Sequence, residues 1–514
     1  MKLLLNYYNS HPLRFILIVA LLFRLSAAFF SEGYGMSDDH YKIIEEANKQ
    51  RNGEPSKFWT PGFDENLVSK RAMLYPVANY QLFTTLESIG IDDPKIKMLI
   101  NRILHALLSL LTVYLTYLIA MQLSVKKVAL EASWLAALFW LMPMLGVRNL
   151  IEVVSIPFLM GGTYFFLRSF KEDKNLINYC IAGFLLGLAF VIRYQTGAFS
   201  LGLGIILLFH KKWKAFLTMS FLITIPLLFN HVVIESWIYG FYPFEKPFNY
   251  LANGFNLENA RKYVAGPWYL FLLLFLGLFI PPYSFLLLRG GIAVSKKQLV
   301  IVLPFLIFFL FHSIFPGKQE RFILPVMLFF PIIGLIGLEE LQKTSNWFIK
   351  RPNFIATSKK IFWTINILLL FPMTLSSTKL ARVDACYALH EVPSKEKNCF
   401  LLVGNKVSDL SLIPWFYANV SKEPIGFRIA DMDELEKFKL LTFNAQDDWV
   451  PDYLFLFDHE QKKEKLAFIK TFYPELELVF VAENSLVDNI MQKLNKRNRN
   501  FEIEVYKLGK FLKE

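Results

Sequence analysis

Residues 13–30 read LRFILIVALLFRLSAAFF, an apolar run long enough to cross a membrane as one α-helix. About 18 to 20 apolar residues span roughly 30 Å of hydrocarbon at the helical rise. No small-residue cleavage site before a soluble mature chain follows this run, so we predict an uncleaved first transmembrane helix and no secretory signal. Lys2 and Arg14 lie at its amino end, which positive-inside sorting assigns to the cytoplasm.

Ten further apolar runs follow the first one along the chain. Of the 514 residues, 54% are hydrophobic and 51 are Phe, which is too apolar for an ordinary soluble domain. We therefore predict a membrane all-α fold, a polytopic bundle of about eleven transmembrane helices. The ten runs cover residues 98–121, 129–147, 153–169, 176–192, 197–210, 214–233, 267–288, 298–314, 321–338 and 360–377.

Lysine and arginine residues gather in every second loop between these runs. Positive-inside sorting assigns those loops to the cytoplasm, and it accounts for the formal charge of +12 without a nucleic-acid partner. We expect the loops on the opposite side to share one external vestibule. They cover residues 31–97, 148–152, 193–196, 235–267 and 316–321.

The composition changes after residue 377, which predicts two domains. Residues 1–377 would form the transmembrane domain, with a large first external loop at 31–97, and residues 378–514 an extracytoplasmic C-terminal domain. In the second domain, strand-like runs begin as CFLLV at Cys399, DYLFLF at Asp452 and LELVFVA at Leu476, and helical periodicity covers 485–496. These patterns predict a small soluble α/β domain.

The three cysteines are too few for a disulfide scaffold and form no CxxC pair. Cys386 and Cys399 fit either a disulfide in an oxidising compartment or two reduced thiols. No cofactor is firmly implied. A divalent metal stays open, although no residue spacing requires one and no metal ligands are assigned.

Two adjacent carboxylates, Asp38 and Asp39, follow the first apolar run in the sequence SDDH. A carboxylate close to a hydrocarbon boundary tends to have a raised pKa, which suits a general base that takes a proton from a hydroxyl. Neighbouring side chains do not easily point into one pocket, so one Asp would act while the other orients it or binds. A solvated loop with a helix cap explains the same residues equally well.

Two further stretches place polar groups on the predicted external side. In KRAMLYP (70–76), Arg71 offers a planar fork of donors for a phosphate and precedes Tyr75, although a snorkelling headgroup anchor fits as well. Asn149 and Glu152 would share a helical face. Ionisable groups at membrane depth usually serve function or pair with each other, so a structural pair between Arg148 and Glu152 stays open.

Cations also stand where positive-inside sorting does not place them. Arg193 ends an apolar run in FVIRYQT (190–196), and this exception favours a functional role. In PGKQERF (316–322), Lys318 and Arg321 would neutralise a departing phosphate, while Glu320 holds one of them in place.

The external segment 235–269 reads ESWIYGFYPFEKPFNYLANGFNLENARKYVAGPWY. Its aromatic, Asn and Gly residues suit stacking on sugars and hydrogen bonds to hydroxyls. An aromatic belt at the membrane interface is the plainer explanation of the same composition.

Taken in order, these segments resemble glycosyltransferase family 22, the Alg9-like and GPI mannosyltransferases of the GT-C superfamily. Met36-Ser37-Asp38-Asp39 is similar to the family's acidic motif in the first luminal loop, with Asp38 in the acidic position. The family's Arg-Ser-x-x-Tyr-Pro, Asn-x-x-Glu and Arg-Pro-Thr elements resemble the sequences beginning at Arg71, Asn149 and Arg193, the last without its proline.

Two later segments carry the most specific part of this resemblance. The family's aromatic loop is similar to Tyr239-Gly240, Phe248-Asn249-Tyr250 and the stretch from Tyr263 to Trp268. Its His-Lys-Glu-x-Arg-Phe motif resembles the stretch 317–322, with the His lost and the acidic position moved by one. The resemblance covers residues 13–338 and leaves the C-terminal segment unexplained.

The resemblance implies a GT-C type bundle that transfers mannose, with inversion, from a polyprenyl-phosphate-mannose donor to a glycan or lipid-linked acceptor on the non-cytoplasmic face. Asp38 would deprotonate the acceptor with Asp39 in support. The donor phosphate would meet Arg71, Arg193, Lys318 and Arg321. Substrate contacts would come from Tyr75, Asn149, Glu152, Tyr239, Asn249, Tyr263, Trp268 and Glu320.

Two other functions stay open at this point. The chain could be a transporter or flippase for an anionic lipid or solute, although its polar residues gather at one face and no internal repeat is visible. A GT-C enzyme that transfers another sugar or acts on protein also fits. We expect a multi-pass protein of a bacterial inner membrane with an outward-facing site, or of the endoplasmic reticulum membrane if the cell is eukaryotic.

Overall fold

The computed structural model describes residues 2–51, 72–172, 176–239, 266–406, 410, 412–420, 424–443, 450–457, 461–495 and 500–512. The chain forms two compact units. The helical unit comprises Met1–Ala28, Phe58–Tyr75 and Ile103–Leu375. The sheet unit comprises Phe29–Lys57, Pro76–Arg102 and Ser376–Glu514, so it draws on the first external loop as well as on the C-terminal segment.

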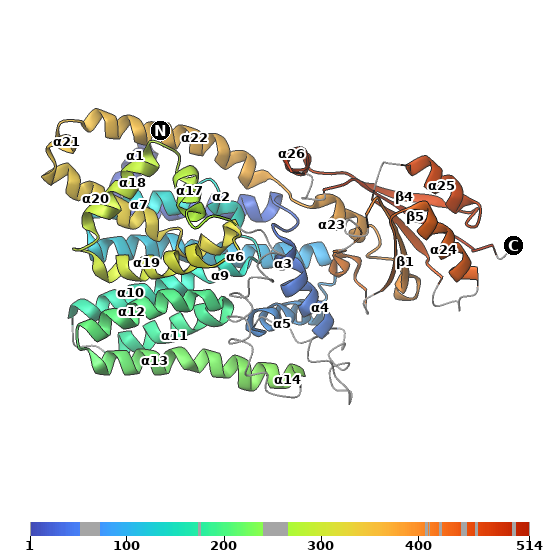
Figure 1. Cartoon of the computed structure of the whole chain (residues 1–514), viewed down its shortest axis with the longest axis horizontal. Coiled ribbons are helices and arrows are strands. Elements are labelled where there is room, and N and C mark those ends of the chain that lie inside the picture. The colour runs from blue at the N-terminus through green and yellow to red at the C-terminus, as the bar shows by residue number, and fades with distance from the viewer. Residues whose placement is uncertain are drawn as a thin grey trace. The chain divides into compact units, whose positions relative to one another are not determined.

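Long and short helices build the helical unit (Figure 1). A π-helical stretch Phe229–Ile234 joins α13 to α14, and 3-10 turns lie at Tyr194–Thr196 and Glu320–Val326. Three of the helices, α2, α5 and α6, also contribute residues to the sheet unit. The helices are α1 (Lys2–Ser10), α2 (Pro12–Phe30), α5 (Leu74–Ser88), α6 (Pro94–Leu123), α7 (Lys126–Leu138), α8 (Met142–Leu145), α9 (Ile151–Val154), α10 (Ile156–Glu172), α11 (Leu176–Ile192), α12 (Gly197–Phe209), α13 (Trp213–Leu228), α14 (Glu235–Tyr239), α17 (Leu270–Leu278), α18 (Tyr283–Val294), α19 (Leu299–Ile314), α20 (Phe329–Thr344), α21 (Asn346–Ile349) and α22 (Pro352–Leu375).

By length and composition, five helical stretches of the described residues are able to cross a membrane. A sixth is obtained if the pair Glu320–Val326 and Phe329–Thr344, bent by 55°, counts as one span. The five are Pro12–Phe30, Pro94–Leu123, Ile151–Lys171, Trp213–Tyr239 and Pro352–Leu375. Every apolar run predicted from the sequence contains α-helix, three of them with interruptions, and the figure of about eleven spans stays a prediction.

Three of the runs are interrupted where a single helix was expected. The run 129–147 stops being helical after Leu138 and resumes as the short helix α8. Pro281 and Pro282 separate α17 from α18 within the run 267–288, because proline lacks the N–H that helix continuation needs. The run 321–338 begins as a 3-10 turn before α20 starts at Phe329.

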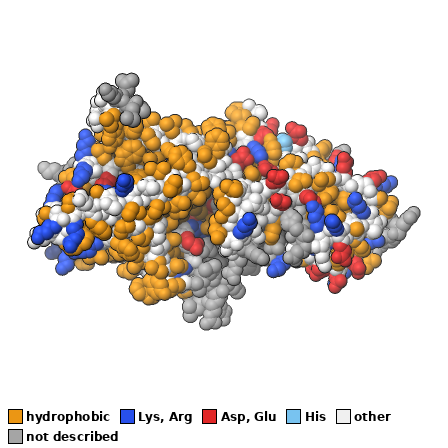
Figure 2. Space-filling view, turned by 90° about the horizontal axis from the view of Figure 1, so that it is seen from above, with side chains coloured by type: hydrophobic (Ala, Val, Ile, Leu, Met, Phe, Trp, Pro, Cys, Tyr) orange, Lys and Arg blue, Asp and Glu red, His pale blue; other side chains and the backbone are white. Residues whose placement is uncertain are grey.

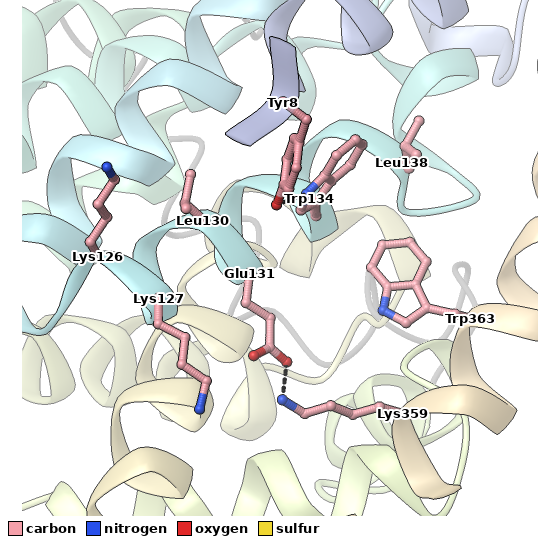
Figure 3. Close-up of a pocket in the computed structure, with 9 residues that line it drawn as sticks. All are labelled: Tyr8, Lys126, Lys127, Leu130, Glu131, Trp134, Leu138, Lys359 and Trp363. Atoms are coloured by element: carbon pink, nitrogen blue, oxygen red, sulfur yellow. Dashed lines mark hydrogen bonds and ion pairs between the residues drawn. The ribbon is translucent and has the colours of Figure 1, made fainter. Parts of the chain in front are cut away.

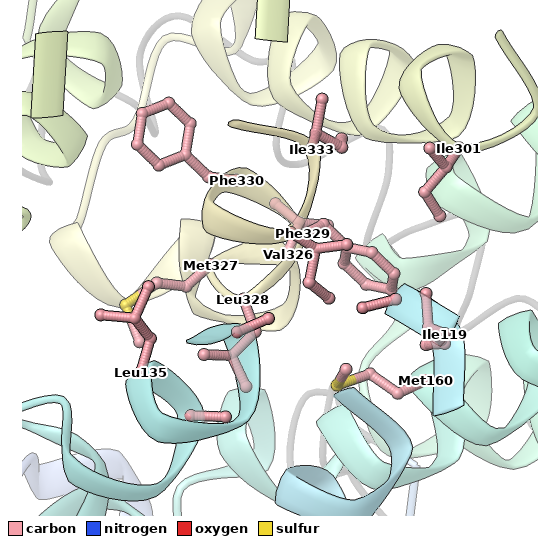
Figure 4. Close-up of a cluster of buried hydrophobic side chains, with 14 of the residues drawn as sticks. Ile119, Leu135, Met160, Ile301, Val326, Met327, Leu328, Phe329, Phe330 and Ile333 are labelled. Atoms are coloured by element: carbon pink, nitrogen blue, oxygen red, sulfur yellow. The ribbon is translucent and has the colours of Figure 1, made fainter. Parts of the chain in front are cut away.

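Helix α20 contributes a fully buried stretch to the core of the helical unit. Each residue from Phe329 to Leu338 is buried, as expected for a helix that is apolar all round. Figure 4 shows Val326 and Phe329 gathered with Ile119, Met160 and Ile301 from other helices. This cluster holds the segment 320–328 against the bundle.

Glycines allow two helices of the unit to approach closely. Gly183 and Gly187 of α11 face α13, where an added Cβ would lie 2.5 Å from the carbonyl oxygen of Met219 and 2.6 Å from that of Ile223. Small residues four positions apart are a common contact between membrane helices because they let the backbones meet. The position of Arg193, just after α11, therefore depends on this packing.

Lysine and arginine side chains gather at one end of the helical unit, on the left of Figure 2. Lys127 lies 3.5 Å from Glu339, which also meets Lys343 at 3.1 Å, and Lys297 pairs with Glu340. These lysines stand at the ends of α7, α18 and α20, where the sequence predicts cytoplasmic loops.

A mixed five-stranded sheet forms the sheet unit, with strand order β2-β1-β3-β5-β4. Strand β1 pairs in parallel with β2 and β3, while β5 pairs antiparallel with β3 and β4. The strands are β1 (Cys399–Val403), β2 (Ile425–Ile429), β3 (Tyr453–Leu456), β4 (Glu477–Ala482) and β5 (Ile503–Lys507). The helices of this unit are α3 (Ser37–Asp39), α4 (Glu45–Arg51), α23 (Leu380–Tyr387), α24 (Met432–Phe443), α25 (Lys462–Lys470) and α26 (Leu486–Leu494).

The sequence predicted the α/β character of this unit correctly. Strands β1, β3 and β4 and helix α26 coincide with the predicted runs. Cys386 and Cys399 are buried free thiols, so of the two alternatives the structure has the reduced one.

Asp452 precedes β3, and burial together with the nearby Glu396 raises its pKa to about 6. A raised carboxyl pKa means that ionisation costs folded stability as the pH rises through 6. We predict that Asp452→Asn stabilises the sheet unit at pH 7.5 by about 1–2 kcal/mol, after allowance for solvent screening, and has little effect at pH 4. Amide exchange of β1, β3 and β5 in the full chain measures this. Glu477→Gln, which neutralises an exposed carboxylate, is the matched control, and an equal gain at both pH values for Asp452→Asn would contradict the assignment.

Candidate active site

Asp38 and Asp39 differ in their surroundings in the sheet unit. They end the short helix α3, which runs on into the π-helical turn His40–Ile44. Asp39 is only 3% exposed, and its Oδ2 accepts a hydrogen bond from the Met36 backbone N–H at 3.1 Å. Asp38 is partly exposed. Asp39 therefore faces its own backbone, and Asp38 is the carboxylate of the two that a substrate can reach more readily.

A buried polar network holds this segment. The ring of His40 stacks between those of Tyr34 and Tyr417, with centroids 5.0 and 5.5 Å away. Its Nε2 lies 2.9 Å from Oε1 of Glu45. The same oxygen accepts a hydrogen bond from the backbone N–H of Phe416 at 2.9 Å. Contacts from both sides thus fix the turn that directly follows the two aspartates.

The chain just before the aspartates is joined to the segment 376–378 by backbone and side-chain hydrogen bonds. The N–H of Thr378 donates to the carbonyl of Glu32 at 3.0 Å, and the Thr378 hydroxyl donates to the carbonyl of Tyr34 at 2.9 Å. Gly33 lies between them with φ +83° and forms a parallel bridge to Thr378. A Cβ at Gly33 would come 1.7 Å from the Thr378 carbonyl oxygen, so only glycine fits here.

In the helical unit, Glu152 lies between two arginines at the start of α9. Its side chain is completely buried, with one oxygen 3.0 Å from Arg193 Nη2 and 3.7 Å from Arg321 Nε. Both guanidinium groups also lie near the ring of Phe322, at 5.0 and 5.7 Å from its centroid. The structure therefore brings together three residues that are 41 and 128 positions apart in the sequence and that the sequence had placed in one site.

The hydrogen bonds of this cluster are incomplete within the described residues. Neither Glu152 oxygen accepts a hydrogen bond of good geometry there, and Nε and Nη2 of Arg193 donate none. Buried polar groups are nearly always satisfied, and a binding or catalytic role is one explanation for a group that is not. The sequence left open a structural pair between Arg148 and Glu152. In the described residues Glu152 contacts Arg193 and Arg321, and Arg148 is also buried.

Lys318 is held by backbone carbonyl groups close to it in the sequence. Its Nζ donates to the carbonyls of His312, Ser313 and Phe315 at 3.1, 2.7 and 2.7 Å, and burial lowers its pKa. The ammonium thus caps the C-terminal end of α19, where helix carbonyls lack intrahelical donors. In this structure Lys318 shapes the turn that carries Arg321. Glu320 is exposed, and the carboxylate beside Arg321 is Glu152.

Tyr75 and Asn149, both predicted as substrate contacts, meet in the helical unit. The Tyr75 hydroxyl donates to Asn149 Oδ1 at 2.9 Å and lies 2.5 Å from Nε2 of His105. All three side chains are buried. No motif in the sequence points to His105, which lies inside the long helix α6.

A second polar cluster was missed by the sequence reasoning. Glu235 is buried and accepts from Asn230 Nδ2 at 2.9 Å, while its other oxygen lies 2.7 Å from His231 Nδ1. Asn230 Oδ1 in turn accepts from the backbone N–H of Leu74 at 2.8 Å. The signal was a histidine and a glutamate four positions apart at the end of an apolar run. This cluster holds the start of α5, one residue before Tyr75.

The remaining predicted residues are distributed as follows. Tyr239 is buried at the end of α14, and Trp268 is exposed before α17. Arg71, Asn249 and Tyr263 lie outside the described residues. Among the described residues, no group of three or more His, Cys, Asp or Glu side chains is arranged to hold a metal ion.

The sequence pattern of the Alg9-like mannosyltransferase family matches residues 15–406, well over half of the chain. The chain belongs to this family. The Alg9-like protein is 28% identical over 211 residues to alpha-1,2-mannosyltransferase ALG9 of Mus musculus and of Homo sapiens. These matches cover 38% of this chain and about a third, 34%, of the length of either relative.

Solved structures resemble the Alg9-like protein over nearly all of its length. The structure of ArnT from Cupriavidus metallidurans bound to undecaprenyl phosphate aligns with a TM-score of 0.59 at 14% identity, covering 96% of this chain and 97% of that one. An Archaeoglobus fulgidus oligosaccharyltransferase aligns with a TM-score of 0.55 at 11% identity, over 90% and 71% of the two chains. The fold is therefore GT-C-like.

Gly33 provides a test of the anchor beside the two aspartates. We predict that Gly33→Ala destabilises the segment 30–45 by at least about 1–2 kcal/mol, the cost of a left-handed backbone, with the clash against Thr378 in addition. Faster amide exchange of residues 34–45 would report this. Gly90→Ala shares a positive φ of 84° but would meet nothing within 4 Å, so it serves as control. Equal effects of the two variants would contradict the contact.

The ion pair between Glu152 and Arg193 provides a second test. Removing one partner of a buried pair leaves an uncompensated charge and costs about 3–5 kcal/mol, whereas removing both partners costs much less. We predict that Arg193→Gln lowers the thermal unfolding temperature of the purified protein and that adding Glu152→Gln restores part of the loss. Additive losses in the double variant would show that the two groups do not interact.

Proposed function

We propose that this protein is an inverting mannosyltransferase that moves mannose from a polyprenyl-phosphate-mannose donor to a glycan or lipid-linked acceptor on the non-cytoplasmic face. The observation that carries the proposal is the buried group Glu152, Arg193 and Arg321 in a chain of the Alg9-like family. Two guanidinium groups around one carboxylate leave an excess of positive charge, which suits an anionic leaving group.

Arg193 and Arg321 would bind the phosphate of the donor. A guanidinium offers donors in a planar fork that matches phosphate oxygens, and Arg193 has donors without an acceptor in the described part of the chain. Glu152 would hold both forks in orientation. As the bond between the sugar C1 and the phosphate oxygen breaks, the departing polyprenyl phosphate gains negative charge, which these cations stabilise. Arg71 would assist them, and Lys318 would fix the turn before Arg321.

Asp38 would act as the general base. Its carboxylate takes the proton of the acceptor hydroxyl while the oxygen forms a bond to C1 of mannose, so the configuration at C1 inverts. Asp39, buried against the Met36 N–H, would fix the backbone of that turn. Contacts to the sugars would come from Tyr75, Asn149, Tyr239, Asn249, Tyr263, Trp268 and Glu320.

The donor's prenyl tail would lie in an apolar groove between α17, α18, α19 and α20. This groove has a volume of about 290 Å³ and is lined by Phe275, Phe305, Phe309 and Phe330 among other apolar side chains. Phe275 stacks with the other three rings at centroid distances of 5.1 to 6.2 Å. In support, the similar ArnT structure is one with undecaprenyl phosphate bound.

Asp38→Asn tests the base directly. We expect at least a hundredfold loss in transfer of labelled mannose from a polyprenyl phosphate carrier by the purified full-length protein, because general bases contribute about 10²–10⁴-fold. Asp92→Asn removes an exposed carboxylate of the same unit and should retain the wild-type rate. Full activity of Asp38→Asn would remove Asp38 from this role. Flux of an anionic lipid without sugar transfer would favour a transporter instead.

A further inference from the structure

A second groove lies in the helical unit and takes no part in the site described above. It runs along α7 between α1 and α22 and has a volume of about 760 Å³. Figure 3 shows its lining side chains, with Lys126 and Lys127 at the start of α7 and Leu138 at the end. Thirteen residues at the helical rise make the groove wall about 20 Å long.

The character of the lining changes along this length. Lys126, Lys127 and Lys359 provide three ammonium groups at one end, whereas Leu130, Trp134 and Trp363 provide apolar surface farther along. A charged end joined to an apolar channel, parallel to a helix of a membrane protein, matches the shape and polarity of a lipid with an anionic headgroup.

The acidic side chain in the groove, Glu131, already has partners within the protein. Glu131 lies 2.5 Å from Lys359 Nζ and accepts a hydrogen bond from the Tyr283 hydroxyl at 3.0 Å. Lys127 meets Glu339 at 3.5 Å, outside the groove lining, while Lys126 is exposed and has no ion pair within the described residues. The lining therefore carries a net positive charge with Lys126 uncommitted, which is complementary to a phosphate.

Aromatic rings form the wall beyond the lysines. Tyr8 of α1 lies against Trp134, with ring centroids 6.2 Å apart and the indole N–H donating to the Tyr8 hydroxyl at 3.4 Å. Phe15 of α2 contacts both rings at 5.5 and 6.1 Å. Trp and Tyr are favoured at the level of lipid headgroups because each has an apolar ring and one polar atom. The groove thus joins helices from three parts of the chain.

We infer that this groove binds one anionic phospholipid of the cytoplasmic leaflet, with the phosphate at Lys126 and Lys127 and an acyl chain along Trp134 and Trp363. The polyprenyl-phosphate donor of the proposed reaction fits this groove less well than a phospholipid does. Its phosphate belongs with Arg193 and Arg321, beyond the far end of α7, because α7 leads from Lys126 toward α8 and α9. The bound lipid would tie α1 to α7 and α22.

Lipid binding by the full-length protein tests this inference. Native mass spectrometry in neutral detergent measures the affinity for phosphatidylglycerol, with phosphatidylcholine and a polyprenyl phosphate as competing probes. We expect the double variant Lys126→Gln, Lys127→Gln to bind phosphatidylglycerol about tenfold more weakly, since each cation near a headgroup contributes modestly. Lys211→Gln, Lys214→Gln removes the same charge from exposed positions at the start of α13, also on the predicted cytoplasmic side, and should bind as the wild type does.

Trp363→Ala provides an independent variant that leaves every charge in place. The substitution removes part of the apolar wall, so we expect it to weaken phosphatidylglycerol binding as well. In lipid-free detergent the variant should unfold at the same temperature as the wild type. Three results would overturn the inference: equal affinity of the wild type and the Lys126, Lys127 variant, equal affinity for phosphatidylcholine, or displacement of phosphatidylglycerol by polyprenyl phosphate at lower concentration. The binding readout does not depend on sugar transfer, so it stands apart from the proposed function.

Discussion

Burying a carboxylate costs free energy unless cations or hydrogen-bond donors compensate it, and Glu152 lies beside two cations, Arg193 and Arg321. These residues begin α9, follow α11 and lie in the 3-10 turn before α20, so one ion cluster fixes three connections of the bundle at the same point. The α11 glycines and the buried α20 core hold the backbone that carries the arginines. The cluster therefore forms only when these helices are packed together. It concentrates positive charge at the place where we propose that the phosphate is released.

The two ends of the helical unit use cations in different ways. At one end lysines are exposed and pair with exposed or partly exposed glutamates, as Lys343 does with Glu339. Such pairs contribute little to stability and serve mainly to orient the chain in the membrane. At the other end Arg193 and Arg321 are buried, and Nε and Nη2 of Arg193 donate no hydrogen bond within the described residues. This contrast is the physical reason for assigning lipid-headgroup contact to the first end and chemistry to the second.

Much of this architecture could be predicted from the sequence because apolar runs and strand patterns are local signals. Strand β1, with five buried residues, was predicted, whereas β2 lies at the edge with mostly exposed side chains and β5 alternates, so neither was selected. Arg193 was predicted as a functional residue because it lies on the predicted external side, where positive-inside sorting does not place a cation. His105 and the Glu235 cluster were missed, since their importance comes from partners such as Tyr75 and Leu74 that only folding brings near. The role of Lys318 as a helix cap was hidden for the same reason.

The central claim is that Arg193 and Arg321 receive the phosphate of the lipid donor. The most direct measurement is an experimental structure of the full-length protein with a polyprenyl phosphate bound. The account predicts phosphate oxygens within hydrogen-bonding distance of both guanidinium groups, with the prenyl chain against Phe275 and Phe330. A phosphate bound at the lysines of α7, or at any place out of hydrogen-bonding reach of Arg193 and Arg321, would contradict it.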